Sequence, residues 1–128
     1  MKRALLLALA LISADTLATD AKKKNTLVAR HWHGKVATAR AAEYEAYLSG
    51  AIAKFPSIKG NRGYQMLRES GGEVTHFSVI SYWESRDAIH AYAGEDISKV
   101  HALPRDPEFL IDPEPNVHNY DLVVDARK

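Results

Sequence analysis

The chain carries six histidines, and two of them, His31 and His33, lie two positions apart among strand-forming residues. Side chains at this spacing project from the same face of a strand. Such a pair could bind a metal ion, but a metal site needs a third and usually a fourth ligand. His76, Glu84 or His118 would serve only if folding brought them close. We therefore predict no metal site, and we expect these histidines to line a ligand cavity or to contact a partner subunit.

Arg30 and Trp32 occupy the other face of the same predicted strand. An arginine that is buried among apolar residues must find an anion or another acceptor. Two interpretations remain open for its guanidinium. It either holds an anionic ligand or oxyanion, or it forms an ion pair with a helix carboxylate such as Glu43 or Glu45.

Several further residues later in the chain could take part in chemistry. His101 lies in a segment that is broken by prolines, where site loops tend to lie. An imidazole with an ordinary pKa of about 6.5 can act as a base at neutral pH, although an exposed loop histidine is the simpler interpretation. Tyr92 has helical spacing from Ile89, yet its hydroxyl could reach a cavity. Trp83 could pack or contact substrate, and His118 could serve the site or a dimer interface.

Four stretches rich in strand-forming residues are expected to be the strands that position these side chains: 26–33, 63–69, 74–83 and 117–124. Gly34 is expected to close the first strand. The Gly71-Gly72 pair predicts a tight turn, so that the second and third strands form a hairpin.

Two helices are expected between the strands. Thr38 can cap the first, and Pro56 ends it. Its apolar residues recur at the spacing of one helix face: Tyr44, Tyr47, Leu48, Ala51, Ile52 and Phe55. Ser85 caps the second helix and Gly94 ends it. A further helical piece around 96–102 is left open, and the four prolines that follow are expected to forbid regular structure up to the last strand.

The order strand, helix, strand, strand, helix, strand predicts an α+β fold of the ferredoxin-like βαββαβ type, with a four-stranded antiparallel sheet. Its helices would cover one face of the sheet. A chain of 128 residues has no second layer for the other face. A second copy of the chain, sheet against sheet, would cover it, so we predict a homodimer.

The N-terminus begins with a short basic stretch and an unbroken apolar run at 4–12. This pattern is typical of a secretory signal, and the run is shorter than the about 20 apolar residues that span a membrane. We predict a signal peptide at 1–18, a polar linker at 19–25 and one domain at 26–124, although a buried N-terminal helix is an alternative. The mature protein would be periplasmic or secreted, without a stable membrane anchor.

The composition excludes several classes of function. Without the predicted signal, the basic and acidic side chains are equal in number, so we expect no nucleic-acid partner. The chain has no cysteine, which excludes disulfides, thiolate metal sites and cysteine nucleophiles.

Short motifs occur at 30–34 (RHWHG), 60–63 (GNRG), 82–85 (YWES), 88–94 (AIHAYAG), 109–110 (FL) and 117–120 (VHNY). Together they resemble the antibiotic biosynthesis monooxygenase family, of the dimeric α/β-barrel group, from about Leu27 to Val124. The resemblance implies a homodimer with a cavity between sheet and helices. It also implies an enzyme that adds oxygen to electron-rich aromatic substrates without metal or flavin, so no cofactor is expected.

A related branch of these proteins degrades haem with an Asn on the first strand, a Trp on the second helix and a haem-ligating His after it. Those positions fall here at Arg30 or His31, at Tyr92, and at or beside His101. Only the histidine is kept. Haem degradation is therefore not predicted, whereas haem binding remains open.

Our leading interpretation is a cofactor-independent monooxygenase-like protein for a small aromatic or quinone-like compound, with Arg30, Tyr92 and His101 as catalytic residues. The predicted substrate-binding residues are His31, Trp32, His33, Trp83 and His118. An export signal is unusual for a biosynthetic enzyme. The alternatives are a non-catalytic dimeric protein that binds a hydrophobic ligand such as haem, and a stress-related structural domain.

Overall fold

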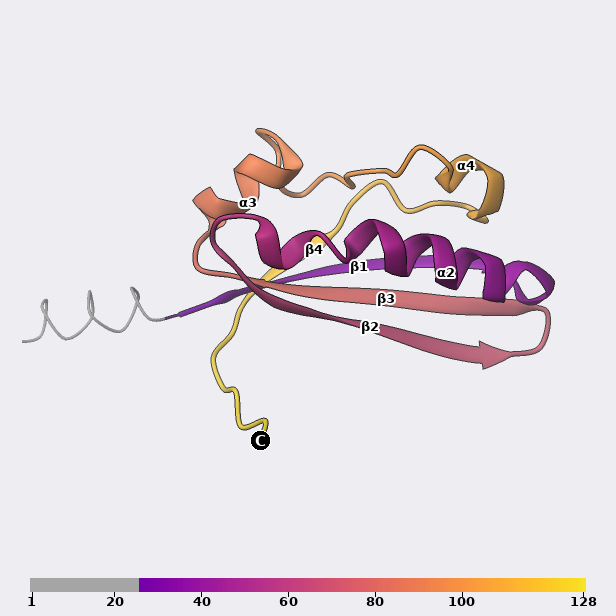
Figure 1. The fold of residues 1–128 in the computed structure, drawn as a ribbon, viewed down its shortest axis with the longest axis horizontal. Coiled ribbons are helices and arrows are strands. Elements are labelled where there is room, and N and C mark those ends of the chain that lie inside the picture. Colours follow the sequence, from indigo (N-terminus) through magenta and orange to yellow (C-terminus); the bar gives the residue numbers. More distant parts are fainter. Residues whose placement is uncertain (1–25) are drawn as a thin grey trace, which may run out of the picture.

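The computed structural model describes residues 26–128, and the predicted signal peptide and linker lie outside the described residues. Its strands form one antiparallel sheet in the order β2-β3-β1-β4, as Figure 1 shows. The strands are β1 (Val28–Ala37), β2 (Asn61–Gly71), β3 (Val74–Trp83) and β4 (His118–Asp121). This topology confirms the predicted ferredoxin-like α+β fold.

The helices all lie on one side of the sheet (Figure 1). They are the α-helices α2 (Ala41–Ile52), α3 (Arg86–Ala93) and α4 (Asp106–Phe109), and the short 3-10 helices η1 (Thr38–Arg40) and η2 (Phe55–Ser57). None of the helices in this part of the chain is long and apolar enough to cross a membrane. Because the helices lie on one side, the other face of the sheet carries no helix from residues 26–128.

The core forms where α2 packs on the centre of the sheet. Tyr44, Leu48 and Ile52 of α2 are buried at intervals of four residues, because this spacing returns each side chain to the same helix face. They contact the buried side chains of Val36 and Phe77 on β1 and β3. Removing these apolar surfaces from water is the main term that stabilises the helix on the sheet.

The first strand is longer than predicted, because it continues through Gly34 to Ala37. Gly34 pairs with Phe77 across the ladder. The indole of Trp32 folds over it, so that a Cβ at Gly34 would lie 2.5 Å from Cη2 of Trp32. The glycine thus makes room for an aromatic ring within the strand, and the prediction that it ends the strand is wrong.

The first helix is shorter than predicted: it begins after Thr38 and ends before Pro56. Thr38 does not cap it, because its hydroxyl donates to the carbonyl of Gly72 at 3.0 Å and so joins η1 to the hairpin. The α-helix begins at Ala41 and ends at Ile52, and Phe55 continues the buried stripe from the separate 3-10 turn η2.

The second helix begins and ends as predicted. The Ser85 hydroxyl accepts a hydrogen bond from the Ala88 amide at 3.1 Å, and Gly94 ends the helix with a φ of 87°. No helix forms at 96–102. The helix α4 forms instead at Asp106–Phe109, within the proline-rich stretch. Pro107 is tolerated because it lies in the first turn, where a missing N–H breaks no helical hydrogen bond.

Candidate active site

A cavity of about 40 Å³ lies between the helices and the sheet. Arg30 and Trp32 of β1 form part of its wall, Tyr92 comes from α3, His101 from the segment that follows, and Asp106 from α4. Apolar side chains of α2 and β3 line much of the remainder. The fold thus brings together the three residues that the sequence suggested as catalytic, which are 71 positions apart at their extremes.

Arg30 is 5% exposed and reaches from β1 to the segment after α3. Its Nη1 donates to the carbonyl of Ile97 and, at 3.5 Å, to Oδ1 of Asn119. Its Nη2 donates to the carbonyl of Lys99 at 2.9 Å. The guanidinium therefore fastens this segment to the sheet, and burial lowers its pKa from the ordinary value.

The interpretation of Arg30 as an ion-pair partner of a helix carboxylate is wrong. Glu43 pairs with Arg40 at 3.1 Å, and Glu45 pairs with Arg68 at 2.9 Å. Within residues 26–128, Arg30 forms no ion pair with a carboxylate. Its hydrogen-bond partners are carbonyl and amide oxygens, which carry no net charge, so the guanidinium itself can still attract a negative ligand atom at the cavity wall.

Tyr92 lies between the core and the cavity mouth. Its ring stacks on Trp83, with centroids 5.8 Å apart, and contacts the ring of His101, with centroids 4.6 Å apart. Burial raises the pKa of Tyr92, while the charge of Arg30 opposes this shift. The phenol therefore stays protonated at neutral pH and can donate its hydroxyl proton in a hydrogen bond.

His101 is exposed at the cavity mouth. Partial desolvation lowers its pKa, and the positive charges of Lys54 and Arg30 lower it further. The imidazole is therefore neutral at pH 7, which leaves one ring nitrogen free to accept a proton.

The two predicted tryptophans occupy different places. Trp32 lines the cavity, as a substrate-binding residue must. Trp83 is fully buried and does not line it. The Trp83 indole donates to the Ser81 hydroxyl at 2.8 Å and packs beneath Tyr92, so its contribution to the site is to support that ring.

The predicted substrate-binding histidines project from the opposite face of the sheet. His31 lies beside His118 in the register of β1 and β4. His33 Nε2 is 2.9 Å from Nδ1 of His76, and its Nδ1 contacts the carboxylate of Glu114. These side chains line no part of the cavity. Over the described residues, no group of three or more potential ligands is arranged to hold a metal ion.

The sequence did not indicate Tyr44 and Asp106 as residues of the site, yet both line the cavity. The hydroxyl of Tyr44 donates to Oδ1 of Asp106 at 2.9 Å, and the amide of Leu103 donates to Oδ2 at 2.9 Å. Burial, followed by the neighbouring carboxylate, strongly raises the pKa of Tyr44. The available signal was an aspartate directly before a proline, which is a common start for a short helix.

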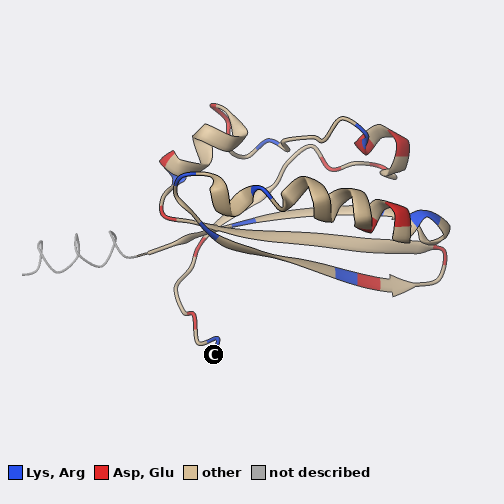
Figure 2. Ribbon diagram, viewed as in Figure 1, with Lys and Arg blue, Asp and Glu red and all other residues tan. Residues whose placement is uncertain are grey.

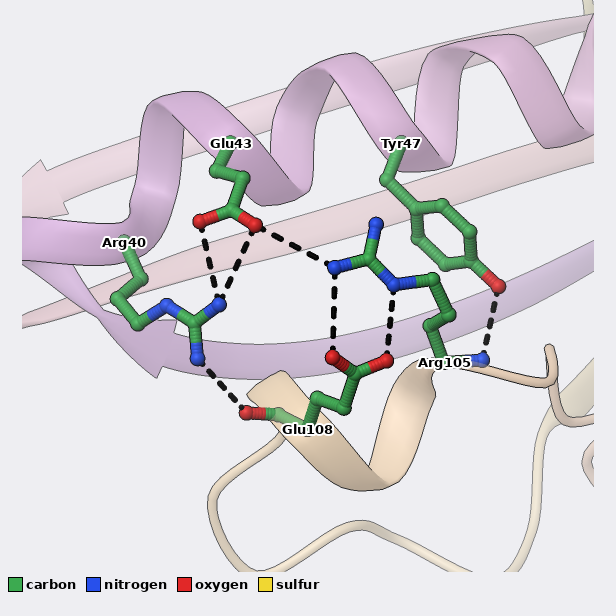
Figure 3. A network of polar contacts seen from close by, with 5 residues as sticks. All are labelled: Arg40, Glu43, Tyr47, Arg105 and Glu108. Carbon is green, nitrogen blue, oxygen red and sulfur yellow. Dashed lines mark hydrogen bonds and ion pairs between the residues drawn. The ribbon is translucent and has the colours of Figure 1, made fainter.

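A network of exposed charges holds α4, and with it Asp106, against α2. Charges of both signs gather where the two helices meet (Figure 2). Arg105 forms ion pairs with Glu108 at 2.8 Å and with Glu43 at 3.4 Å, while Arg40 donates to the Glu108 carbonyl at 3.1 Å. Figure 3 shows how these side chains converge. The Arg105 amide also donates to the Tyr47 hydroxyl at 2.9 Å. Exposed pairs contribute little singly, but a network of this kind fixes the orientation of α4.

Several solved structures share this fold. A protein of unknown function from Nitrosomonas europaea is 17% identical, with a TM-score of 0.60 over 82% of this chain and 97% of its own. A haem-degrading protein from Mycobacterium tuberculosis is 21% identical, with a TM-score of 0.54 over 81% and 99%. A Bacillus cereus protein assigned to antibiotic biosynthesis monooxygenases is 12% identical, with a TM-score of 0.58 over 81% and 100%. The chain matches no curated protein.

A family model supplies a more specific match than these distant structures. It covers residues 31–102, more than half of the chain, from β1 to the segment that carries His101. The family that it describes is that of the antibiotic biosynthesis monooxygenases. The chain therefore belongs to the antibiotic biosynthesis monooxygenase family.

Proposed function

We propose that this protein is a cofactor-independent monooxygenase for a small aromatic or quinone-like compound. The observation that carries this proposal is the meeting of Arg30, Tyr92 and His101 at one largely apolar cavity. Apolar walls favour an aromatic ring, and the three polar side chains supply a base and hydrogen-bond donors. Family membership supports the same class of reaction.

The chemistry follows from the protonation states of these groups. Neutral His101 accepts a proton from the substrate, and the resulting anion is stabilised by the Arg30 guanidinium and the Tyr92 hydroxyl. The electron-rich anion then reduces dioxygen. One oxygen atom enters the substrate, and the other leaves as water with two hydrogens taken from the substrate. The substrate supplies all four electrons that dioxygen takes up, so no separate reductant is needed.

Oxygen uptake tests this proposal directly. Purified protein in a chelator-treated buffer should consume oxygen with anthrone or hydroquinone, without added metal or reductant. The His101→Ala variant should lose most of this activity, since the base contributes about 100-fold or more. If the wild type consumes no more oxygen than the His101→Ala variant with any of a panel of such substrates, the proposed monooxygenase activity is refuted.

A non-catalytic haem-binding function is the second candidate, and the exposed, neutral imidazole of His101 favours it. A haem does not fit the cavity of about 40 Å³ as it stands, so the segment after α3 would have to move outward. Titration with hemin separates the two functions. A Soret shift that His101→Ala abolishes, together with absent oxygen uptake, would support binding over catalysis.

We also propose that the protein is a homodimer. The sheet face without helices exposes Leu67 by 49% and Tyr120 by 52%, and a second copy would cover both. We further propose that residues 1–18 are removed on export to the periplasm or medium. N-terminal sequencing of the protein from the cell envelope tests this, and an intact Met1 would contradict it.

A further inference from the structure

The side chain of Asp106 lines the cavity. It is 5% exposed, and its two oxygens accept hydrogen bonds from Tyr44 and Leu103. A carboxylate has about four lone-pair positions, so acceptor capacity remains after these two bonds. No Lys, Arg or His of residues 26–128 forms an ion pair with it. This group can only accept further hydrogen bonds, which the mechanism above does not use.

Other groups of the cavity wall have unused donors. Arg30 has five N–H groups, of which two on Nη1 and one on Nη2 are bonded to Ile97, Asn119 and Lys99. Among residues 26–128, its bonds all run through Nη1 and Nη2, so the N–H of Nε and one N–H of Nη2 are left for a ligand. The cavity therefore combines spare donors on Arg30 with spare acceptors on Asp106.

We propose that Asp106 determines specificity and that the cavity selects an aromatic ring with two oxygen groups, of which one is a free hydroxyl. One oxygen, as the anion, receives hydrogen bonds from Arg30 and Tyr92. The other keeps its proton and donates to Asp106. This inference rests on the proposed function and deepens it by naming the substrate class.

The size of the cavity restricts the ligand further. Its volume of about 40 Å³ is less than the roughly 150 Å³ that accommodates benzene in an engineered protein. Even a single ring would therefore need the mouth, where His101 is exposed, to move outward, and a larger ring system would need a larger movement. A hydroquinone-type compound has one ring and two oxygen groups, which matches the placement of donors on Arg30 and acceptors on Asp106.

The matched ligand pair for a test is hydroquinone and its monomethyl ether. Both keep one hydroxyl that can become the anion, but the ether replaces the second hydroxyl with an oxygen that only accepts. That oxygen would face the Asp106 carboxylate without a proton between them. A site that hydrogen-bonds a substrate hydroxyl discriminates strongly against an analogue that lacks it, because the buried polar group is left unpaired.

Binding is measured under argon, without turnover, by quenching of tryptophan fluorescence, since Trp32 lines the cavity. The full wild-type protein should bind hydroquinone at least about ten-fold more tightly than the ether. In Asp106→Asn, whose amide can itself donate, this ratio should fall to about one or invert. The matched control is Tyr44→Phe, which removes the hydroxyl that bonds to Asp106 but keeps the carboxylate, and it should retain the preference.

Equal affinity of the wild type for the two compounds would overturn the proposal, as would binding of neither compound or an unchanged ratio in Asp106→Asn. If Asp106→Asn fails to fold, the wild-type ratio alone decides. Oxygen uptake measured in parallel separates the two proposals. Uptake that depends on His101, combined with equal wild-type affinities, would overturn this inference and leave the proposed monooxygenase intact.

Discussion

The rings of Tyr92 and His101 lie with their centroids 4.6 Å apart, so that the end of α3 and the segment after it present one polar pair to the cavity. Their protonation states are complementary. The phenol of Tyr92 is kept protonated by burial, and the imidazole of His101 is kept neutral by desolvation and by nearby cations. A donor and a base thus adjoin the same ligand space.

The pH dependence of catalysis should reflect the lowered pKa of His101. A base must be deprotonated to act. The acid limb of the kcat/KM profile should therefore lie below the pKa of an unperturbed imidazole, which is about 6.5. Lys54 contributes to this shift through its charge. Lys54→Gln should therefore raise the His101 pKa and move the limb upward, as followed by NMR titration of the ring. The exposed Lys59→Gln serves as the control, and an equal shift in both variants would argue against a specific effect.

Folding stability should change with pH for the same reason. Because the folded pKa of His101 is lowered, the unfolded chain binds a proton more readily than the folded protein. This group therefore contributes a loss of stability as pH falls through about 6.5 toward the folded pKa. Comparing urea unfolding of wild type and His101→Gln at pH 8 and below pH 6 isolates the effect. The difference between the proteins should grow in favour of the variant at the lower pH.

Arg30→Met should lower both stability and activity. It leaves the carbonyls of Ile97 and Lys99 without their charged donor, at a cost of about 2 kcal/mol in the free energy of unfolding. Loss of oxyanion stabilisation should reduce kcat by about 100-fold. The matched control is Arg62→Gln, whose exposed pair with Glu84 contributes less than about 1 kcal/mol. Urea unfolding and oxygen uptake measure the two effects, and equal losses in both variants would contradict the assigned role of Arg30.

Two glycine-to-alanine substitutions should have opposite effects. At Gly34 the added Cβ would meet the Trp32 ring at 2.5 Å, which should destabilise the fold by about 1–3 kcal/mol and change tryptophan fluorescence. At Gly50, inside α2, nothing lies within 4 Å of the added atom. That substitution should stabilise the protein by about 0.5–1 kcal/mol. Thermal unfolding distinguishes the signs, and a neutral Gly34→Ala would show that the ring moves aside freely.

The proposed homodimer makes its own prediction at Leu67, on the sheet face without helices. Leu67→Glu would place a carboxylate from each subunit in the covered interface, so light scattering should report a monomer. Ala46→Glu adds the same charge on the exposed surface of α2 and should leave the mass unchanged. A wild-type protein that stays monomeric at high concentration would contradict the dimer.

The sequence was sufficient to predict the fold because the four strands and the two longer helices carry their own local signals, whereas the short helix α4 was not predicted. The alternation in β3 and the helical spacing of Tyr44 and Leu48 are such signals. The structure buries these side chains as the patterns predict. The strand end was misplaced at Gly34, because the reason for that glycine is a ring two residues earlier that folds back over it. Local pattern cannot show such a contact.

The candidate site was only partly predictable for a related reason. Arg30, Tyr92 and His101 stood out by residue type, but nothing local indicated that the carbonyls of Ile97 and Lys99 would be the partners of Arg30. Asp106 was missed entirely. It accepts a hydrogen bond from Tyr44, 62 positions earlier, and such long-range pairings follow from tertiary packing.

The most direct test of the proposed monooxygenase is the fate of isotopically heavy dioxygen with hydroquinone as substrate. The wild type should form hydroxybenzoquinone with one heavy oxygen atom in the product and the other in water, detected by mass spectrometry. His101→Ala should show only the background. Spontaneous oxidation instead gives benzoquinone and hydrogen peroxide, with no heavy oxygen in the ring product. Wild-type product without heavy oxygen above the His101→Ala background, across hydroquinone and anthrone, would contradict the central claim.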